Sequence, residues 1–116
     1  MIEYQFEKTD SYLIVKAAGP WHLQEFIKMI DDFVSECRRL GCQRVLIEGE
    51  GMYGPVPNLD RYYAGKHIAQ VCRGIRIAGV FRAEEINKFA ENTAVNRGAE
   101  FYVTSDRDDA LRWLIG

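Results

Sequence analysis

The stretch Gly49–Gly54 has the spacing that points most directly to chemistry, because it fits the pattern G-x-G-x-x-G. In dinucleotide-binding folds, these glycines permit a tight turn and bring the backbone close to a pyrophosphate at a helix N-terminus. Pro55 and Pro57 follow at once, and a proline inside the next helix would remove a donor and clash. The next apolar run ends at Phe81 and Arg82, without the acidic residue that holds a ribose. The pattern therefore favours a connection shaped by glycine and proline, with nucleotide binding as the weaker alternative.

Histidine and cysteine residues are few and badly spaced for catalysis or metal binding. His22 and His67 match no metal-ligand spacing, and Cys37, Cys42 and Cys72 contain no C-x-x-C pair. An odd number of cysteines is also a poor basis for a disulfide framework. No serine lies near a histidine in a way that indicates a nucleophile and its base. We therefore expect no catalytic residue, no metal and no cofactor.

Length and charge narrow the class of protein further. The chain has 116 residues, of which 47% are hydrophobic, enough to predict one domain spanning residues 1–116 with a proper core. Fifteen basic and 17 acidic side chains give a net charge of −2, which argues against strong sequence-independent binding of nucleic acid. The first residues lack the pattern of a signal peptide, and no stretch approaches the ~18 apolar residues of a membrane span. These features predict a cytoplasmic protein.

The segment Gly49–Asn58 is nevertheless the best candidate for a binding site. It follows a short apolar run, and loops at the carboxyl ends of parallel strands line the crevice in which α/β folds bind ligands. It is also longer than the ~2–6 residues usual for such a connection. Its methionine and the nearby tyrosines are residue types enriched in interface cores. The residues expected to contact a ligand or partner are Met52, Tyr53, Gly54, Asn58, Tyr62, Tyr63 and Arg82. The alternative for the tyrosines is that they pack the following helix onto the sheet.

The elements that position these residues follow from the spacing of apolar side chains. The segment Trp21–Leu40 has apolar residues three and four positions apart, which predicts a helix that ends before Gly41. Residues 3–8 alternate polar and apolar side chains, and Tyr12–Ala18 is a second apolar run, so the two predict an antiparallel hairpin. Val45–Ile47 is continuously apolar, as expected of a strand covered on both faces.

The second half of the chain alternates helices with short strands. A helix is expected over Leu59–Val71, with Asn58 as its N-cap and Asp60 in its first turn, and another over Ala83–Asn96. A final helix is expected to be capped by Ser105 or Asp106 and to bury Ala110, Leu111 and Leu114. The remaining strands are Ile75–Phe81 and Phe101–Val103. The order is β-β-α-β-α-β-α-β-α, which predicts a mixed five-stranded sheet with four helices.

This order of elements resembles the SpoIIAA-like (anti-sigma-factor-antagonist-like) branch of the STAS domain family. Val15–Gly19 looks like the strand that ends in glycine before the first helix, and Arg44–Glu48 looks like the third strand. The tail, with Asn96–Gly98, Ser105–Asp106 and Ala110–Leu114, is similar to the closing strand and helix of such proteins. The resemblance covers the whole chain.

The resemblance implies a regulatory, non-enzymatic module that acts through a protein partner and forms a homo-oligomer. In anti-sigma-factor antagonists, a serine at the start of the second helix is phosphorylated. The corresponding stretch here, Gly49–Asp60, contains neither serine nor threonine, so the phosphoserine switch is not carried over. SpoIIAA-like proteins also look similar to the lipid-transfer CRAL-TRIO fold. The alternative function is therefore a carrier or sensor of a small apolar ligand, with Met52, Tyr62, Tyr63 and Phe81 lining a pocket.

Overall fold

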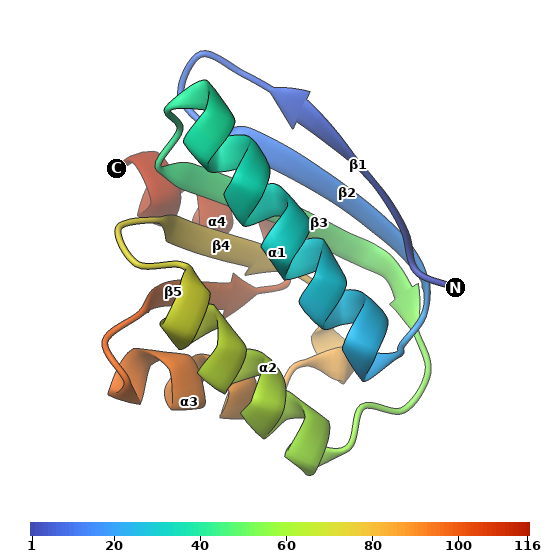
Figure 1. Cartoon of the computed structure of the whole chain (residues 1–116). Coiled ribbons are helices and arrows are strands. Elements are labelled where there is room, and N and C mark those ends of the chain that lie inside the picture. Colours follow the sequence, from blue (N-terminus) through green and yellow to red (C-terminus); the bar gives the residue numbers. More distant parts are fainter.

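The computed structural model describes all residues from 1 to 116 and contains one mixed sheet with helices on both faces (Figure 1). The strands lie in the order β1-β2-β3-β4-β5; β1 and β2 pair in antiparallel fashion, and every later pair is parallel. The elements in chain order are β1 (Glu3–Lys8), β2 (Leu13–Pro20), α1 (Leu23–Leu40), β3 (Arg44–Tyr53), α2 (Asn58–Val71), β4 (Arg76–Val80), the 3-10 turn η1 (Ala83–Glu85), α3 (Phe89–Asn96), β5 (Glu100–Thr104) and α4 (Arg107–Ile115). The predicted fold class and element order are confirmed.

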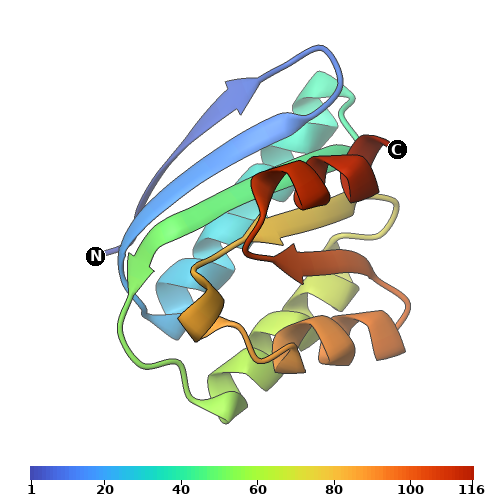
Figure 2. The same cartoon turned by 180° about the vertical axis from the view of Figure 1, so that it is seen from behind.

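Helices cover the two faces of the sheet unequally. Helices α1, α2 and α3 lie on one face, and α4 alone lies on the other (Figures 1 and 2). The run Val45–Ile47 was predicted to be covered on both sides, and it is: Val45 and Ile47 join the core under α1–α3, whereas Leu46 joins the core under α4. Every one of these three side chains is fully buried. Because successive side chains of a strand point to opposite faces of the sheet, this one apolar run contributes residues to both cores.

The long helix α1 confirms the prediction from its apolar stripe. The ring nitrogen Nδ1 of His22 accepts a hydrogen bond from the Glu25 N–H at 3.4 Å, at the N-terminus of α1. At the other end, Gly41 adopts φ 68°, the left-handed conformation that glycine favours at helix ends. The buried residues of α1 are Phe26, Met29, Ile30, Phe33, Val34 and Cys37. This face packs on the sheet and supplies six of the 21 buried residues of the larger core.

The prediction of a loop beginning at Gly49 is wrong, because β3 continues to Tyr53. The end of β3 pairs with the end of β2, and Ala18, Gly19 and Pro20 lie opposite Gly51, Met52 and Tyr53. This long-range pairing overrides the low strand propensity of glycine. Only residues 54–57 connect β3 to α2, and the N-cap of α2 is Pro57 rather than Asn58, which is the first helical residue. Pro57 therefore stands where its missing N–H costs the helix no hydrogen bond.

The predicted helix Ala83–Asn96 is interrupted. A 3-10 turn covers Ala83–Glu85, and α3 begins only at Phe89. Lys88, at the N-cap of α3, has φ 64° and is the only residue other than glycine with a positive φ. The Asn87 side chain accepts a hydrogen bond from the Phe89 N–H at 3.0 Å, a local contact that competes with continuous helix.

The last helix begins as one of the two predicted alternatives. The Asp106 carboxylate accepts hydrogen bonds from the N–H groups of Asp108 and Asp109, at 2.9 and 3.4 Å, so Asp106 is the N-cap of α4. Ala110 and Leu114 are buried as predicted, and Leu111 is only partly buried. None of the helices combines the length and apolar character that crossing a bilayer requires.

Candidate functional site

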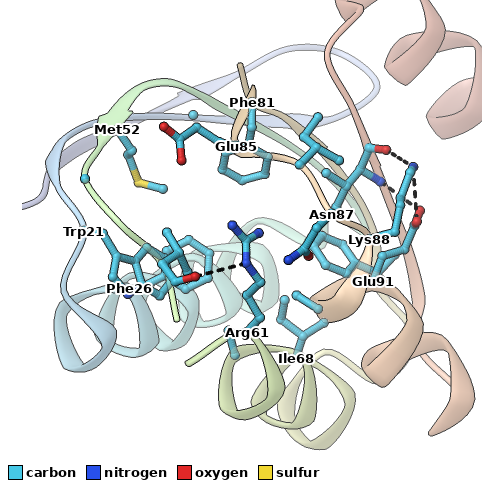
Figure 3. A pocket seen from close by; sticks show the side chains of 18 of the residues that line it. Trp21, Phe26, Met52, Arg61, Ile68, Phe81, Glu85, Asn87, Lys88 and Glu91 are labelled. Atoms are coloured by element: carbon cyan, nitrogen blue, oxygen red, sulfur yellow. Dashed lines mark hydrogen bonds and ion pairs between the residues drawn. The ribbon is translucent and has the colours of Figure 1, made fainter. Parts of the chain in front are cut away.

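A pocket opens on the face of the sheet covered by α1–α3, at the carboxyl ends of β3 and β4 (Figure 3). It encloses about 730 Å³ of empty space with its mouth included, and the centre of a water-sized sphere reaches about 80 Å³ of this. The pocket is therefore narrow. The chain segments that line it are the start of α1, the end of β3, the inward face of α2 as far as Ile68, Phe81, the segment 85–91 and β5.

Phe81 lies against two glycines at the sheet side of the pocket. A Cβ atom added at Gly49 would overlap the Phe81 ring, and one added at Gly79 would lie 2.6 Å from Cε2 of the same ring. Ile47 and Gly79 are partners in the β3–β4 register, so the two glycines lie on adjacent strands. The missing side chains therefore leave the space in which the Phe81 ring rests on the sheet. This accounts for Gly49, the first glycine of the G-x-G-x-x-G pattern, without a phosphate.

An irregularity in β3 turns Met52 toward the pocket. Lys16 pairs with Glu48 and Ala18 with Gly51, so three steps along β3 match two steps along β2. One extra residue reverses the alternation of side chains beyond it, which is how a β-bulge re-aims a strand. Met52 thereby joins the core on the α1–α3 side and is almost fully buried there. The glycine-rich sequence thus serves a bulge that completes the pocket lining.

Trp21 and Phe26 form the aromatic wall on the α1 side. Their ring centroids are 4.8 Å apart. The Trp21 indole N–H donates to the Asp60 carboxylate at 2.8 Å, and its backbone N–H donates to the Tyr53 carbonyl at 2.7 Å. Trp21 thereby joins the start of α1 to both α2 and the end of β3, and these contacts hold the indole at the pocket.

Arg61 is the polar side chain at the centre of the pocket. It extends from the first turn of α2 into the space between Phe26, Phe81 and Asn87 (Figure 3). Its Nε donates to the Val56 carbonyl at 3.3 Å. Arg61, Ala64 and Ile68 share the inward face of α2, and all three line the pocket.

Two charged residues close the pocket on the α3 side. The Lys88 ammonium lies 3.1 Å from the Glu91 carboxylate and donates to the Val103 carbonyl. Glu91 in turn accepts a hydrogen bond from the Val103 N–H at 3.0 Å. The opposite charges of Lys88 and Glu91 compensate each other, and both side chains also bond to Val103 on β5. This pair of residues, the Lys88–Glu91 clasp, therefore fixes the start of α3 against the edge of the sheet.

The cysteines are poorly suited to nucleophilic chemistry. Burial raises the pKa of Cys37 and of Cys72 to about 12, so both are thiols at neutral pH. The histidines lie elsewhere: His67 Nε2 is 2.6 Å from Asp31 Oδ1, a contact that joins α2 to α1.

The residues singled out from the sequence fall into two groups. Met52, Tyr53 and Gly54 line the pocket. Asn58, Tyr62, Tyr63 and Arg82 lie outside its lining.

Each of the four outer residues has a different environment. Asn58 accepts a hydrogen bond from the Asn87 side chain at 2.9 Å, and Tyr62 packs near Arg97, the C-cap residue of α3. Arg82 donates to the Met52 carbonyl at 2.9 Å, and Tyr63 is 44% exposed. Tyr62 and Tyr63 therefore do not share the pocket with Met52 and Phe81.

Sequence reasoning missed Arg61, Trp21 and Glu85, all of which line the pocket. The helical spacing of Arg61 with Ala64 and Ile68 was the signal that could have found the arginine. Trp21 and Glu85 reach the pocket through tertiary contacts, which no local pattern marks.

Known structures agree with this fold. An anti-sigma factor antagonist from Mycobacterium paratuberculosis covers 100% of this chain and 96% of its own, with a TM-score of 0.69 at 13% identity. An uncharacterised DUF3478-family protein with a SpoIIAA-like fold from Shewanella loihica covers 97% of this chain and 93% of its own, with a TM-score of 0.52 at 23% identity. RsbS from Moorella thermoacetica, carrying a serine-to-glutamate substitution, covers 94% of this chain and 92% of its own, with a TM-score of 0.56 at 13% identity. No protein-family model and no curated protein matches the sequence. The chain has a STAS-type, SpoIIAA-like fold.

Proposed function

We propose that this protein is a non-enzymatic regulatory module of the SpoIIAA-like kind, and that it binds a small apolar ligand in the pocket between β3, α2 and α3. The observation that carries this proposal is the lining, in which 12 of 19 residues are hydrophobic. Protein interiors are close-packed, so a space with an apolar lining and a few polar groups is the usual form of a ligand site. The three free cysteines agree with the reducing conditions of a cytoplasm.

Native mass spectrometry of protein purified gently from cell extract tests the proposal. We expect a discrete extra mass of a few hundred daltons that is lost on denaturation. The matched variant is Ala64→Phe, which places a ring in the pocket from the buried face of α2. The variant should lose the extra mass while its circular dichroism spectrum stays native. Wild-type protein without the extra mass, even after incubation with a lipid extract, would contradict the proposal. The same spectra measure the predicted homo-oligomer.

A second candidate function is binding of a protein partner beside the pocket. Tyr53, Leu59 and Tyr63 are each 44% to 62% exposed, and large apolar side chains in such positions are typical of interfaces. Anti-sigma factor antagonists with this fold support the idea of a protein partner. The test is a pull-down with Tyr53→Ala and Tyr63→Ala, with the exposed Ile115→Ala on α4 as the control. Partner recovery should fall only in the tyrosine variants, and equal recovery with all three would exclude this surface.

A further inference from the structure

Arg61 carries a positive charge into an apolar pocket without an acidic partner. Its one hydrogen bond in the protein is the 3.3 Å contact from Nε to the Val56 carbonyl, and no carboxylate lies within ion-pair distance of its guanidinium. The terminal nitrogens, which carry most of its donors, point into the pocket (Figure 3). A guanidinium beside aromatic rings loses part of its hydration, so an anion that reaches it gains a strong, charge-assisted contact.

The other charges around the pocket already have partners. Lys88 and Glu91 are 3.1 Å apart, and the Glu85 carboxylate lies 3.8 Å from the Arg82 guanidinium. Arg61 is therefore the one charge among the lining residues without a counter-ion, and it offers a ligand one unpaired positive charge. A phosphate monoester carries up to two negative charges, and Arg61 could pair with only one of them. A carboxylate carries a single negative charge, which Arg61 matches.

The shape of the pocket restricts the rest of the ligand. Trp21, Phe26 and Phe81 present aromatic surface, and the interior leaves only about 80 Å³ to the centre of a water-sized sphere. An alkyl chain or a flat ring can enter such a space, whereas a sugar or a bulky polar group would meet few hydrogen-bonding partners there. On the basis of the proposed function, we infer that the ligand is an amphiphilic monocarboxylate, with its carboxylate bound by Arg61 and a slim apolar body held between the aromatic rings.

The test compares acids with alcohols of the same shape. Trp113 lies on the α4 side of the sheet, so a Trp113→Phe background leaves Trp21 as the only tryptophan and makes its fluorescence a reporter of the pocket. Decanoate with 1-decanol tests a flexible chain, and 2-naphthoate with 2-naphthol tests a flat ring. We expect at least one acid to bind more tightly than its alcohol. Arg61→Met should weaken binding of that acid about 10- to 100-fold and leave binding of the alcohol unchanged.

Controls separate this inference from the proposed function. Arg73→Met makes the same change of net charge at an exposed position after α2, and it should leave the affinity for the acid unchanged. If acid and alcohol bind equally to the wild type and to Arg61→Met, the pocket binds apolar ligands but the carboxylate inference is wrong. If none of the four compounds binds to a folded protein, both the inference and the proposed ligand function fail. Circular dichroism confirms that each variant remains folded.

Discussion

The two faces of the sheet differ in how completely they are filled. Under α1–α3 lies a core of 21 buried residues, and the same face contains the pocket. Under α4 lies a core of five buried residues, flanked by Tyr12, Leu111 and Trp113. The larger face therefore supplies most of the apolar burial and can leave space beside its core, whereas the smaller face does no more than cover the strands. Most of the buried apolar side chains and the pocket thus lie on the same side of the sheet.

The largest expected effect comes from removing a ring in the larger core. Phe33 on α1 is fully buried, and Phe33→Ala should lower the free energy of unfolding by about 3–5 kcal/mol through lost transfer energy and a new cavity. Urea unfolding monitored by circular dichroism measures the change. A loss below ~1 kcal/mol would mean that the larger core is not the main source of stability.

A substitution in the smaller core should cost less and so sharpens the comparison. Leu114 on α4 is also fully buried, but its cluster is small and lies near the end of the chain. We expect Leu114→Ala to cost about 2–3 kcal/mol, the lower part of the range for such changes, because this end of the molecule can relax. If Leu114→Ala destabilises the protein more than Phe33→Ala in the same urea experiment, the larger core does not contribute more stability than the smaller core.

Gly49→Ala tests whether the space beside the larger core depends on the missing side chain. The new methyl group would overlap the Phe81 ring, and the crowding should cost about 1–3 kcal/mol and push the ring into the pocket. Thermal unfolding measures the loss of stability, and Trp21 fluorescence measures any loss of ligand binding. The double variant Gly49→Ala/Phe81→Leu is the control, because a smaller side chain relieves the overlap. Equal stability of the single and double variants would show that Phe81 does not rest on Gly49.

The smallest effect concerns a tyrosine–aspartate hydrogen bond that occurs once on each face. Tyr102 donates to Asp109 at 2.6 Å and holds the pKa of that carboxyl below its ordinary value of 3.8. Tyr4 donates likewise to Asp32, whose pKa is also lowered, but there the largest cause is the bond from Lys28 at 2.8 Å. A lowered folded-state pKa contributes stability that is present above the unfolded value and is lost as pH falls through the folded value.

Tyr102→Phe should therefore destabilise the protein at about pH 6 and have less effect at about pH 2, because the contribution of the ionised Asp109 carboxylate is lost as the pH falls through its lowered folded-state pKa. Tyr4→Phe should show a weaker pH dependence, because Lys28 still stabilises the Asp32 carboxylate. Urea unfolding at the two pH values measures both variants. An equal pH dependence of stability for the two variants would argue that Lys28 is not the main cause of the lowered pKa of Asp32.

The sequence predicted the helices and strands that depend only on the spacing of neighbouring apolar side chains. The stripe along α1, the hairpin of β1 and β2 and the doubly buried run Val45–Ile47 need only the spacing of apolar side chains. The end of β3 was missed because Gly51–Tyr53 becomes a strand only through pairing with β2. The break before α3 was missed because it depends on the Asn87 side chain and on the positive φ of Lys88.

The candidate site was predicted only in part for the same reason. Its place at the carboxyl end of β3 follows from the topology, and Met52, Tyr53 and Gly54 do line the pocket. The positions of Phe81 over Gly49 and of Trp21 against Asp60 are contacts between distant segments, and no periodicity in the sequence marks them.

The Lys88–Glu91 clasp also blocks the edge of the sheet at β5. Strand β5 is an edge strand, and both outward hydrogen-bonding groups of Val103 are taken by these two side chains. A further strand could join this edge only by displacing both of them, so the sheet is protected there against growth by aggregation. The Val103 amide should accordingly exchange its hydrogen slowly for an edge position, and Glu91→Ala should speed that exchange. The other edge, β1, carries Glu3, Glu7 and Lys8, whose charges discourage strand pairing.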